Sequence, residues 1–230
     1  MFFDQDEVFD VFSLEEAPIP PPFGSKLASL IKALGAARTF VPVNERSGNL
    51  IPTDFIRPLR PVSEVFEYRD GNRTVAKETI IVQVDGACSG NGRPEARAGV
   101  GIYFGPGSVE NVSRRIDGRQ TSNHAEVRAA LEAMKKLTEM FDNDRLLLVR
   151  RMVLLVDSSH VFRAMTEWIF SWRENGWRTS GGAEVKNKAC FQELDRIVTA
   201  YESHGFAVQF WLVRREFNKE ADLLAKNSYL

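Results

Sequence analysis

Two acidic residues stand at the ends of apolar runs that have the character of buried strands. Asp85 directly follows the run at residues 79–84, and Asp157 directly follows the run at residues 152–156. Both runs are rich in β-branched or apolar residues, a composition typical of strands buried on both faces. If the two strands are neighbours, their carboxylates emerge at the same edge of the sheet.

Two further acids fall close to the starts of predicted helices. Glu126 and Asp222 each lie in the first turn of a helical pattern. Taken singly, such an acid is more often a helix-cap partner or a surface charge. Four converging carboxylates would repel each other unless divalent cations neutralised them, and hard oxygen ligands select Mg²⁺ or Mn²⁺ over zinc. Two such ions about 4 Å apart can clamp a phosphodiester, one activating water and one stabilising the leaving oxygen. The four acids together predict a site for two Mg²⁺ ions, for which Mn²⁺ could substitute.

The elements that must position these acids can be read from residue 79 onward. We expect strands at 79–84, 99–104, 111–116, 152–156 and 206–213, and helices at 121–140, 161–172, 187–201 and 218–226. A Gly-Pro-Gly turn at residues 105–107 predicts a hairpin between the second and third strands. The order predicts an α/β fold: a five-stranded mixed sheet with helices on both faces.

The first 77 residues have a different composition and are expected to form an extension of the catalytic domain at residues 78–230. Residues 1–20 contain six acids and no base, and eight of the ten prolines precede residue 62. This pattern predicts a largely flexible segment with one short amphipathic helix at residues 25–34. The acidic, Phe-rich start could instead dock on a protein partner or on the basic face downstream.

Composition narrows the class of protein. The 230 residues are 43% hydrophobic and 27% charged, which is typical of globular chains. No apolar run reaches the roughly 18 residues that a membrane helix needs. Two cysteines cannot form a disulfide framework, and the start lacks the features of a secretory signal. We therefore expect a monomer without membrane contact, inside the cell in the nucleus or cytoplasm, and not secreted.

Seven segments, in order and with compatible spacing, resemble the type 1 ribonuclease H domain of eukaryotes. The first is VDGACSGNG at residues 84–92, which contains Asp85. The others are residues 98–107, 118–126, 156–158, 168–180, 185–188 and 218–225. Each segment alone is modest support, but together they are specific and cover about two-thirds of the chain.

The resemblance implies an endoribonuclease that cuts the RNA strand of an RNA/DNA hybrid, leaving a 5′-phosphate and a 3′-hydroxyl. The metal ligands and catalytic residues would be Asp85, Glu126, Asp157 and Asp222. The RNA strand, recognised by its 2′-hydroxyls, would contact Cys88, Ser89, Asn91, Ser122 and Asn123. A pocket for a DNA phosphate would comprise Arg119, Thr121 and Asn187, and a channel for the DNA strand Trp168, Trp172 and Ser180.

The DNA channel also has a physical basis. Trp168 and Trp172 are four residues apart, so they share one face of a helix. Basic residues follow closely at positions 173, 178, 186 and 188. Aromatic faces combined with cations hold a strand without reading its bases. The alternative is that both tryptophans belong to the hydrophobic core.

The sequence departs from the resemblance in three places. Many family members carry a histidine in a glycine-containing loop before the last acid, whereas residues 213–218 are shorter and contain none. We expect slower turnover or altered metal preference, and assign Glu216 no role there. Ser122 stands where an asparagine is usual, which predicts weaker 2′-hydroxyl discrimination. No hybrid-binding module is recognisable in residues 1–75, which predicts low processivity.

Two other functions are compatible with the same sequence. The chain could be a nucleic-acid-binding module that kept the fold without catalysis. It could also be a nuclease of the same fold that acts on other substrates, such as double-stranded RNA, or that works as a 3′ exonuclease. Cleavage of labelled RNA in hybrid, duplex and single-stranded forms separates these possibilities.

Overall fold

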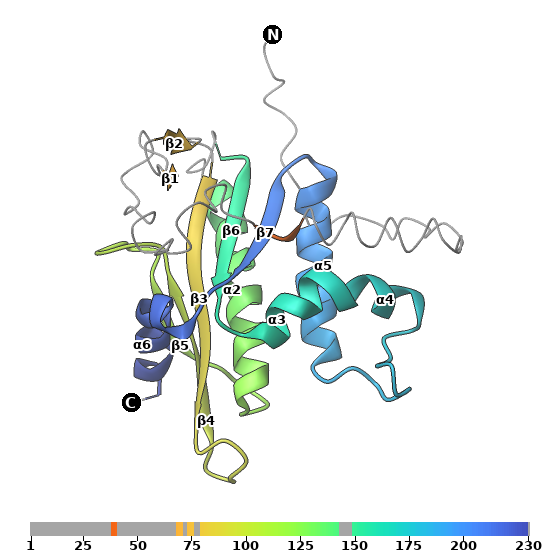
Figure 1. Ribbon diagram of the computed structural model, residues 1–230. Coiled ribbons are helices and arrows are strands. Elements are labelled where there is room, and N and C mark those ends of the chain that lie inside the picture. Colours follow the sequence, from red (N-terminus) through yellow and green to blue (C-terminus); the bar gives the residue numbers. More distant parts are fainter. Residues whose placement is uncertain (1–37, 41–67, 71–72, 76–78, 143–148, 230) are drawn as a thin grey trace.

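The computed structural model describes residues 38–40, 68–70, 73–75, 79–142 and 149–229 (Figure 1). The strands are β1 (Tyr68–Asp70), β2 (Arg73–Val75), β3 (Thr79–Ser89), β4 (Arg97–Tyr103), β5 (Val112–Arg115), β6 (Arg151–Val156) and β7 (Ala207–Leu212). The helices are α2 (Ser122–Asp142), α3 (Ser159–Arg163), the π-helix η2 (Ala164–Trp168), α4 (Ile169–Glu174), α5 (Lys188–Ser203), the 3₁₀ turn η3 (Arg215–Phe217) and α6 (Lys219–Asn227). The short helix expected at residues 25–34 lies outside the described residues.

The main sheet has five strands in the order β5-β4-β3-β6-β7. β3, β4 and β5 are antiparallel, whereas β6 is parallel to both β3 and β7. This confirms the mixed five-stranded sheet. It also confirms that the strand carrying Asp85 and the strand that Asp157 directly follows are neighbours. Gln83 pairs with Leu155, so continuing this parallel register by two residues brings Asp85 level with Asp157.

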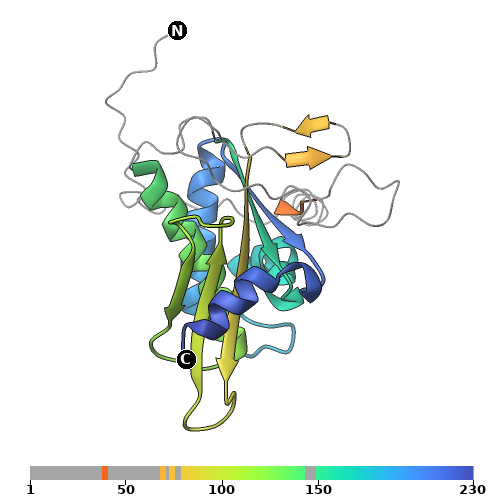
Figure 2. The ribbon, with the colours of Figure 1, turned by 90° about the vertical axis from the view of Figure 1, so that its left-hand side faces the viewer.

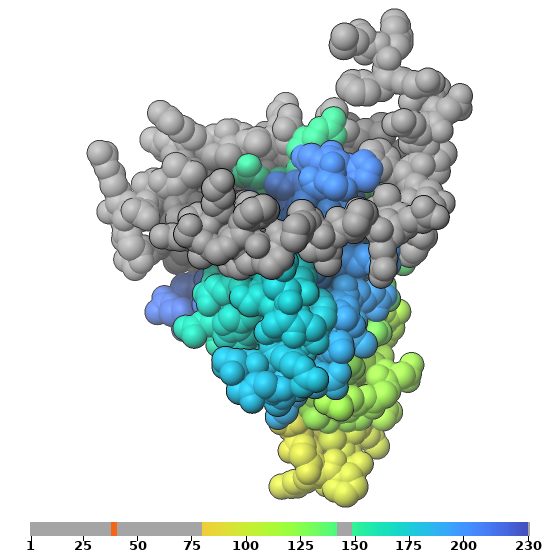
Figure 3. All heavy atoms as spheres, turned by 90° about the vertical axis from the view of Figure 1, so that its right-hand side faces the viewer, coloured from red at the N-terminus to blue at the C-terminus, as the bar shows by residue number. Residues whose placement is uncertain are grey.

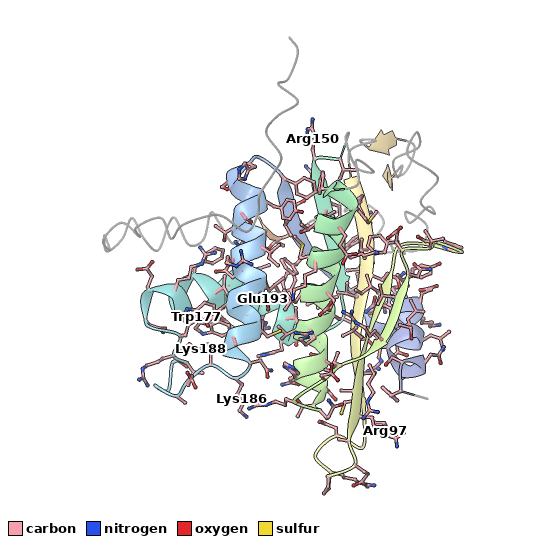
Figure 4. All side chains as sticks on the ribbon, turned by 180° about the vertical axis from the view of Figure 1, so that it is seen from behind. Arg97, Arg150, Trp177, Lys186, Lys188 and Glu193 are labelled. Carbon is pink, nitrogen blue, oxygen red and sulfur yellow. The ribbon has the colours of Figure 1, made fainter. Side chains whose placement is uncertain are left out.

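Helices cover both faces of this sheet, as the sequence predicts. Figure 1 shows α6 in front of the sheet, and Figure 4, from behind, shows α2 and α5 on the opposite face. Figure 2 shows the same layers from the side. The strands meet the helices through a core of fully buried side chains, among them Ile80, Val82, Leu131, Met134 and Phe210. The periodic apolar residues of α2 point into this core because they recur on one helical face.

Most expected boundaries differ from the structure by one or two residues, and two expected elements differ by more. β3 does not end before Asp85 but continues to Ser89, because its backbone pairing with β4 extends from Gln83 to Ser89 regardless of side-chain polarity. The single helix expected at residues 161–172 is divided into α3, η2 and α4. The apolar spacing used for the sequence prediction does not distinguish an α-helical turn from a wider π turn. Glu126 lies one residue beyond the first turn of α2.

Residues 38–40 lie against the main sheet although the sequence assigns them to the extension. Thr39 forms a parallel bridge with Phe210 of β7, and the Phe40 amide donates a hydrogen bond to the Phe210 carbonyl over 2.9 Å. Both Arg38 and Phe40 are buried. The domain boundary at residue 78 stays a prediction.

Candidate active site

Asp85 faces the layer formed by α6, whereas the next residue faces α2. Asp85 pairs with Gly101 across β3 and β4, so the two residues are on the same face. A Cβ atom on Gly101 would lie 2.0 Å from the Ala221 carbonyl oxygen, so glycine lets α6 pack directly on β4. A Cβ atom on Gly86 would lie 2.1 Å from the Glu126 amide nitrogen. These two glycines therefore bring the helices that carry Asp222 and Glu126 close to Asp85.

Asn218 connects the middle of β3 to the residue that directly follows β6. Its Nδ2 donates to the Val84 carbonyl over 3.0 Å and to Oδ1 of Asp157 over 3.1 Å. Its backbone carbonyl accepts from the Asp222 amide over 3.1 Å. Because Asn218 is fully buried, this arrangement fixes the start of α6 relative to β3 and β6.

Glu126 is held by the residue that follows Asp157. The Ser158 hydroxyl donates a hydrogen bond to Oε2 of Glu126 and accepts one from the Val161 amide over 3.3 Å as the N-cap of α3. Burial raises the pKa of Glu126, the Ser158 hydrogen bond opposes that rise, and the charge of Asp157 adds to it. The Ser158 hydroxyl therefore links α2, which carries Glu126, to the segment that follows β6.

Asp222 is engaged by two cations. Arg215 contacts its Oδ1 and Lys226 its Oδ2, each over 2.6 Å. Burial alone would raise the pKa of Asp222, but the hydrogen bonds from Lys226 and Arg215 hold the pKa below its ordinary value. Asp222 is therefore ionised and paired.

The pKa of Asp85 is shifted in the opposite direction from that of Asp222. Burial, followed by the charges of Asp157 and Asp222, raises its pKa to about 7, with Glu126 contributing further and Arg215 opposing the rise. Its Oδ2 is buried without a hydrogen-bond partner. A buried carboxylate oxygen that faces other negative charges favours a bound cation.

The donor chemistry of these four side chains fits a hard divalent ion, since all ligands are carboxylate oxygens. In the part of the chain that the structure describes, no three His, Cys, Asp or Glu side chains form a group that could hold a metal ion. The charges of these carboxylates therefore act on one another, but among the described residues the side chains do not come together closely enough to surround an ion. Their assignment as metal ligands stays a prediction.

The residues expected to contact the RNA strand lie on two adjacent elements. Cys88 and Ser89 end β3, and Asn91 follows in the β3–β4 loop. Oδ1 of Asn91 accepts a hydrogen bond from the Ser122 amide over 3.4 Å, which brings this loop next to the start of α2. Ser89 and Asn91 are exposed, as is Asn123 on α2, and so are available to a ligand; their contacts with RNA stay predictions.

The residues expected to bind a DNA phosphate lie where α2 and α5 begin. Thr121 caps α2, its hydroxyl accepting from the His124 amide over 3.3 Å, and Arg119 is exposed just before it. Burial lowers the pKa of His124, and the nearby Asn187 side chain opposes that shift. Asn187 precedes α5 with a left-handed φ of 60°. The structure therefore brings both parts of the expected pocket together through His124.

The expected DNA channel is more buried than its sequence suggests. The rings of Trp168 and Trp172 are 5.9 Å apart, and Trp172 also contacts Trp177 and Phe191. Trp172 is only 7% exposed, whereas Trp168 is half-buried and Ser180 is exposed. Because so little of Trp172 is exposed, Trp168 offers the larger surface for stacking.

Basic residues lie next to the expected DNA channel. Figure 4 places Lys186 and Lys188 near Trp177 at the end of the molecule formed by the α4–α5 connection. Figure 3 shows the segment from η2 to α5, in cyan and blue, as one continuous surface. Such a surface suits a phosphate backbone.

Two residues with clear positions in the site were missed as functional residues by sequence reasoning. Arg215 contacts Asp222, and Asn218 contacts Asp157. The only sequence signal for Asn218 is its place at the start of the last resembling segment. Arg215 gives no signal, because its significance depends on η3 turning it back toward α6.

Comparison with known proteins identifies the family. Residues 77–229 match the family described as RNase H. The chain is 39% identical over 153 residues to Ribonuclease H1 of Mus musculus, covering 65% of this chain and 50% of that protein. It is 32% identical over 156 residues to Ribonuclease H of Polaromonas sp. (strain JS666 / ATCC BAA-500), covering 66% of this chain and 89% of that protein.

A solved structure shares the fold. The foamy viral protease-reverse transcriptase, solved in complex with an RNA/DNA hybrid, matches with a TM-score of 0.52 and 17% identity, covering 83% of this chain and 23% of that one. The chain belongs to the RNase H family and resembles its type 1 members of eukaryotes, which confirms the family and fold predictions. The chain spans about half the length of the mammalian relatives it matches. In the described part of the chain, no helix is long and apolar enough to cross a membrane.

Proposed function

We propose that this protein is an endoribonuclease that hydrolyses the RNA strand of RNA/DNA hybrids by a two-metal mechanism, leaving 5′-phosphate and 3′-hydroxyl ends. The observation that carries the proposal is geometric: Asp85 lies level with Asp157 in the register of β3 and β6, beside the helices that carry Glu126 and Asp222, and its buried Oδ2 has no hydrogen-bond partner. Membership in the RNase H family supports the same activity.

The carboxylates would hold two Mg²⁺ ions or, as a substitute, Mn²⁺. Asp85 and Asp157 would hold one ion, and Asp85, Glu126 and Asp222 the other. When bound, the ions supply an activated water and stabilise the leaving 3′ oxygen. Arg215 and Lys226 already contact the two carboxylate oxygens of Asp222, so they would compete electrostatically with a metal ion bound there.

The remaining residues position the substrate and the carboxylates. Asn218 holds Asp157, and Ser158 holds Glu126, so both acids keep a fixed orientation before substrate binds. The exposed Ser89 and Asn91 lie on the side expected to contact RNA. Thr121, with its neighbours Arg119 and Asn187, would fix the DNA strand, which determines which strand reaches the carboxylates.

Cleavage of end-labelled RNA tests the proposal directly. The RNA is presented in RNA/DNA, RNA/RNA and single-stranded forms with Mg²⁺, Mn²⁺ or EDTA. We expect internal cuts in the hybrid only, and only with metal. Hybrid binding without cleavage in either metal would support the non-catalytic module, and equal cutting of RNA/RNA would support a nuclease with other substrates.

A further inference from the structure

Three residues far from the family segment are built into its fold. The N-terminal clip, defined as Arg38, Thr39 and Phe40, lies well before residue 77, where the match to the family begins. It extends the sheet at β7 through Phe210, and the Phe40 ring packs 5.0 Å from that of Trp211. The clip is therefore a specific contact with the domain.

Arg38 makes the strongest part of this contact, on α5. Its side chain is 2% exposed and donates to both carboxylate oxygens of Glu202, over 2.8 and 2.7 Å. It also donates to Oδ1 of Asp195 over 3.1 Å and to the Thr199 hydroxyl over 3.3 Å. Bidentate pairing of this kind is geometrically specific, so it holds the clip in one place along α5.

The same guanidinium also contacts the helical segment that carries the tryptophans. It donates to the Met165 carbonyl of η2 over 3.4 Å and lies 5.1 Å from the centre of the Phe170 ring in α4. Arg173 of α4 pairs with Asp195 as well and lies 5.7 Å from the same ring. Arg38 thus joins α5 to residues 164–174.

We propose that the N-terminal clip positions the nucleic-acid surface of the domain, with Arg38 as a positioning residue that fixes Trp168 and Trp172 through η2 and α4. This inference rests on the proposed function. Without Arg38, Glu202 loses its bidentate partner, and the η2 carbonyl and the Phe170 ring lose a cation. A π-helix bordered by α-helices can then shift its turns, which moves the tryptophans relative to the pocket at Asn187.

Burial separates this role from direct contact with nucleic acid. A side chain that is 2% exposed cannot reach a phosphate. Arg38 therefore displaces no counterions from the nucleic acid when the hybrid binds. Loss of Arg38 should weaken hybrid binding without changing the slope of log Kd against log salt. Loss of a true phosphate contact would reduce that slope by about 1.

The test compares full-length Arg38→Ala with wild type and with Arg163→Ala, a control whose arginine is exposed on α3. A milder variant, Glu202→Gln, weakens the same contact if Arg38→Ala does not fold. A pair of truncations, lacking residues 1–36 or 1–40, isolates the clip itself. Each folded protein is assayed for KM and kcat on the hybrid, for hybrid Kd in EDTA at several salt concentrations, and for tryptophan emission.

We expect Arg38→Ala and the 1–40 truncation to raise KM and Kd about five-fold with little change in kcat and an unchanged salt slope. Their tryptophan emission should shift, whereas Arg163→Ala and the 1–36 truncation should resemble wild type. If wild type cuts the hybrid but folded Arg38→Ala or Glu202→Gln has unchanged KM and Kd, the positioning role of the N-terminal clip is wrong and the proposed function still stands. A wild type that neither binds nor cuts hybrid would overturn both proposals.

Discussion

Asn218 donates a hydrogen bond from Nδ2 to Oδ1 of Asp157 over 3.1 Å, and the same nitrogen donates to the Val84 carbonyl. One buried amide therefore ties Asp157, which directly follows β6, to the backbone of β3 next to Asp85. Asp157 reaches the site already oriented, which is the condition for a carboxylate that must bind a cation without reorganising.

Asp157→Asn should abolish hybrid cleavage while leaving binding almost intact. Asparagine keeps an oxygen for the Asn218 hydrogen bond, so the fold is retained, but the negative charge is lost. We expect kcat to fall by about 100-fold or more. Steady-state cleavage and hybrid affinity in EDTA check this. Near-normal cleavage would contradict the assignment of Asp157 to the metal site.

Arg215→Ala should lower the Mg²⁺ concentration needed for half-maximal cleavage. Arg215 pairs with Asp222, and its charge also acts on Asp85, so it competes with a cation for this region. We expect a decrease of about two- to five-fold, the size of an exposed ion pair. Arg214→Ala is the matched control, because Arg214 pairs with Glu216 instead. The same Mg²⁺ requirement in both variants would show that Arg215 does not compete.

The contribution of Asp85 to the stability of the metal-free protein should fall as pH rises from about 4 to about 7. The pKa of Asp85 is raised from its ordinary 3.8 to about 7, so folding favours the protonated form. This contribution is fully present below 3.8 and is lost as pH rises through 7.

Asp85→Asn removes that dependence and should stabilise the protein at pH 8 in EDTA, by on the order of 2 kcal/mol. Thermal unfolding at several pH values measures the effect, with Asp117→Asn, at an exposed position, as control. Added Mg²⁺ should raise the Tm of wild type more than that of Asp85→Asn. An Asp85→Asn variant that is less stable than wild type at pH 8 would show that the buried charge is already compensated.

The two tryptophans should separate binding from stability. Trp168→Ala should weaken hybrid binding by about 1–3 kcal/mol, the contribution of one stacking contact. Trp172→Ala should instead lower the free energy of unfolding by about 3–5 kcal/mol, because Trp172 is 7% exposed and packs in the core. Hybrid affinity and chemical denaturation of both variants distinguish the roles. Equal losses of affinity at equal stability would place both rings in the channel.

The sequence predicts most of the fold because strands and helices of this domain follow local apolar periodicity. The sequence predicts that Asp85 and Asp157 emerge at the same edge only if their two strands are neighbours. The pairing of β3 with β6 confirms that they are. The contacts of Arg38 could not be predicted, since Asp195 and Glu202 are more than 150 residues away and nothing local marks a basic residue as buried. The cations on Asp222 were missed for a related reason: a loop must turn before Arg215 can reach it.

Gly86 and Gly101 lie on opposite faces of the sheet, and each is covered by the main chain of a different helix. Direct contact between the main chain of the sheet and the main chains of these helices therefore sets the separation between Asp85 and the helices that carry Glu126 and Asp222. The three atoms nearest to the position of each missing Cβ are all main-chain atoms. A side chain at either position would push its helix outward, and would move Glu126 or Asp222 away from Asp85.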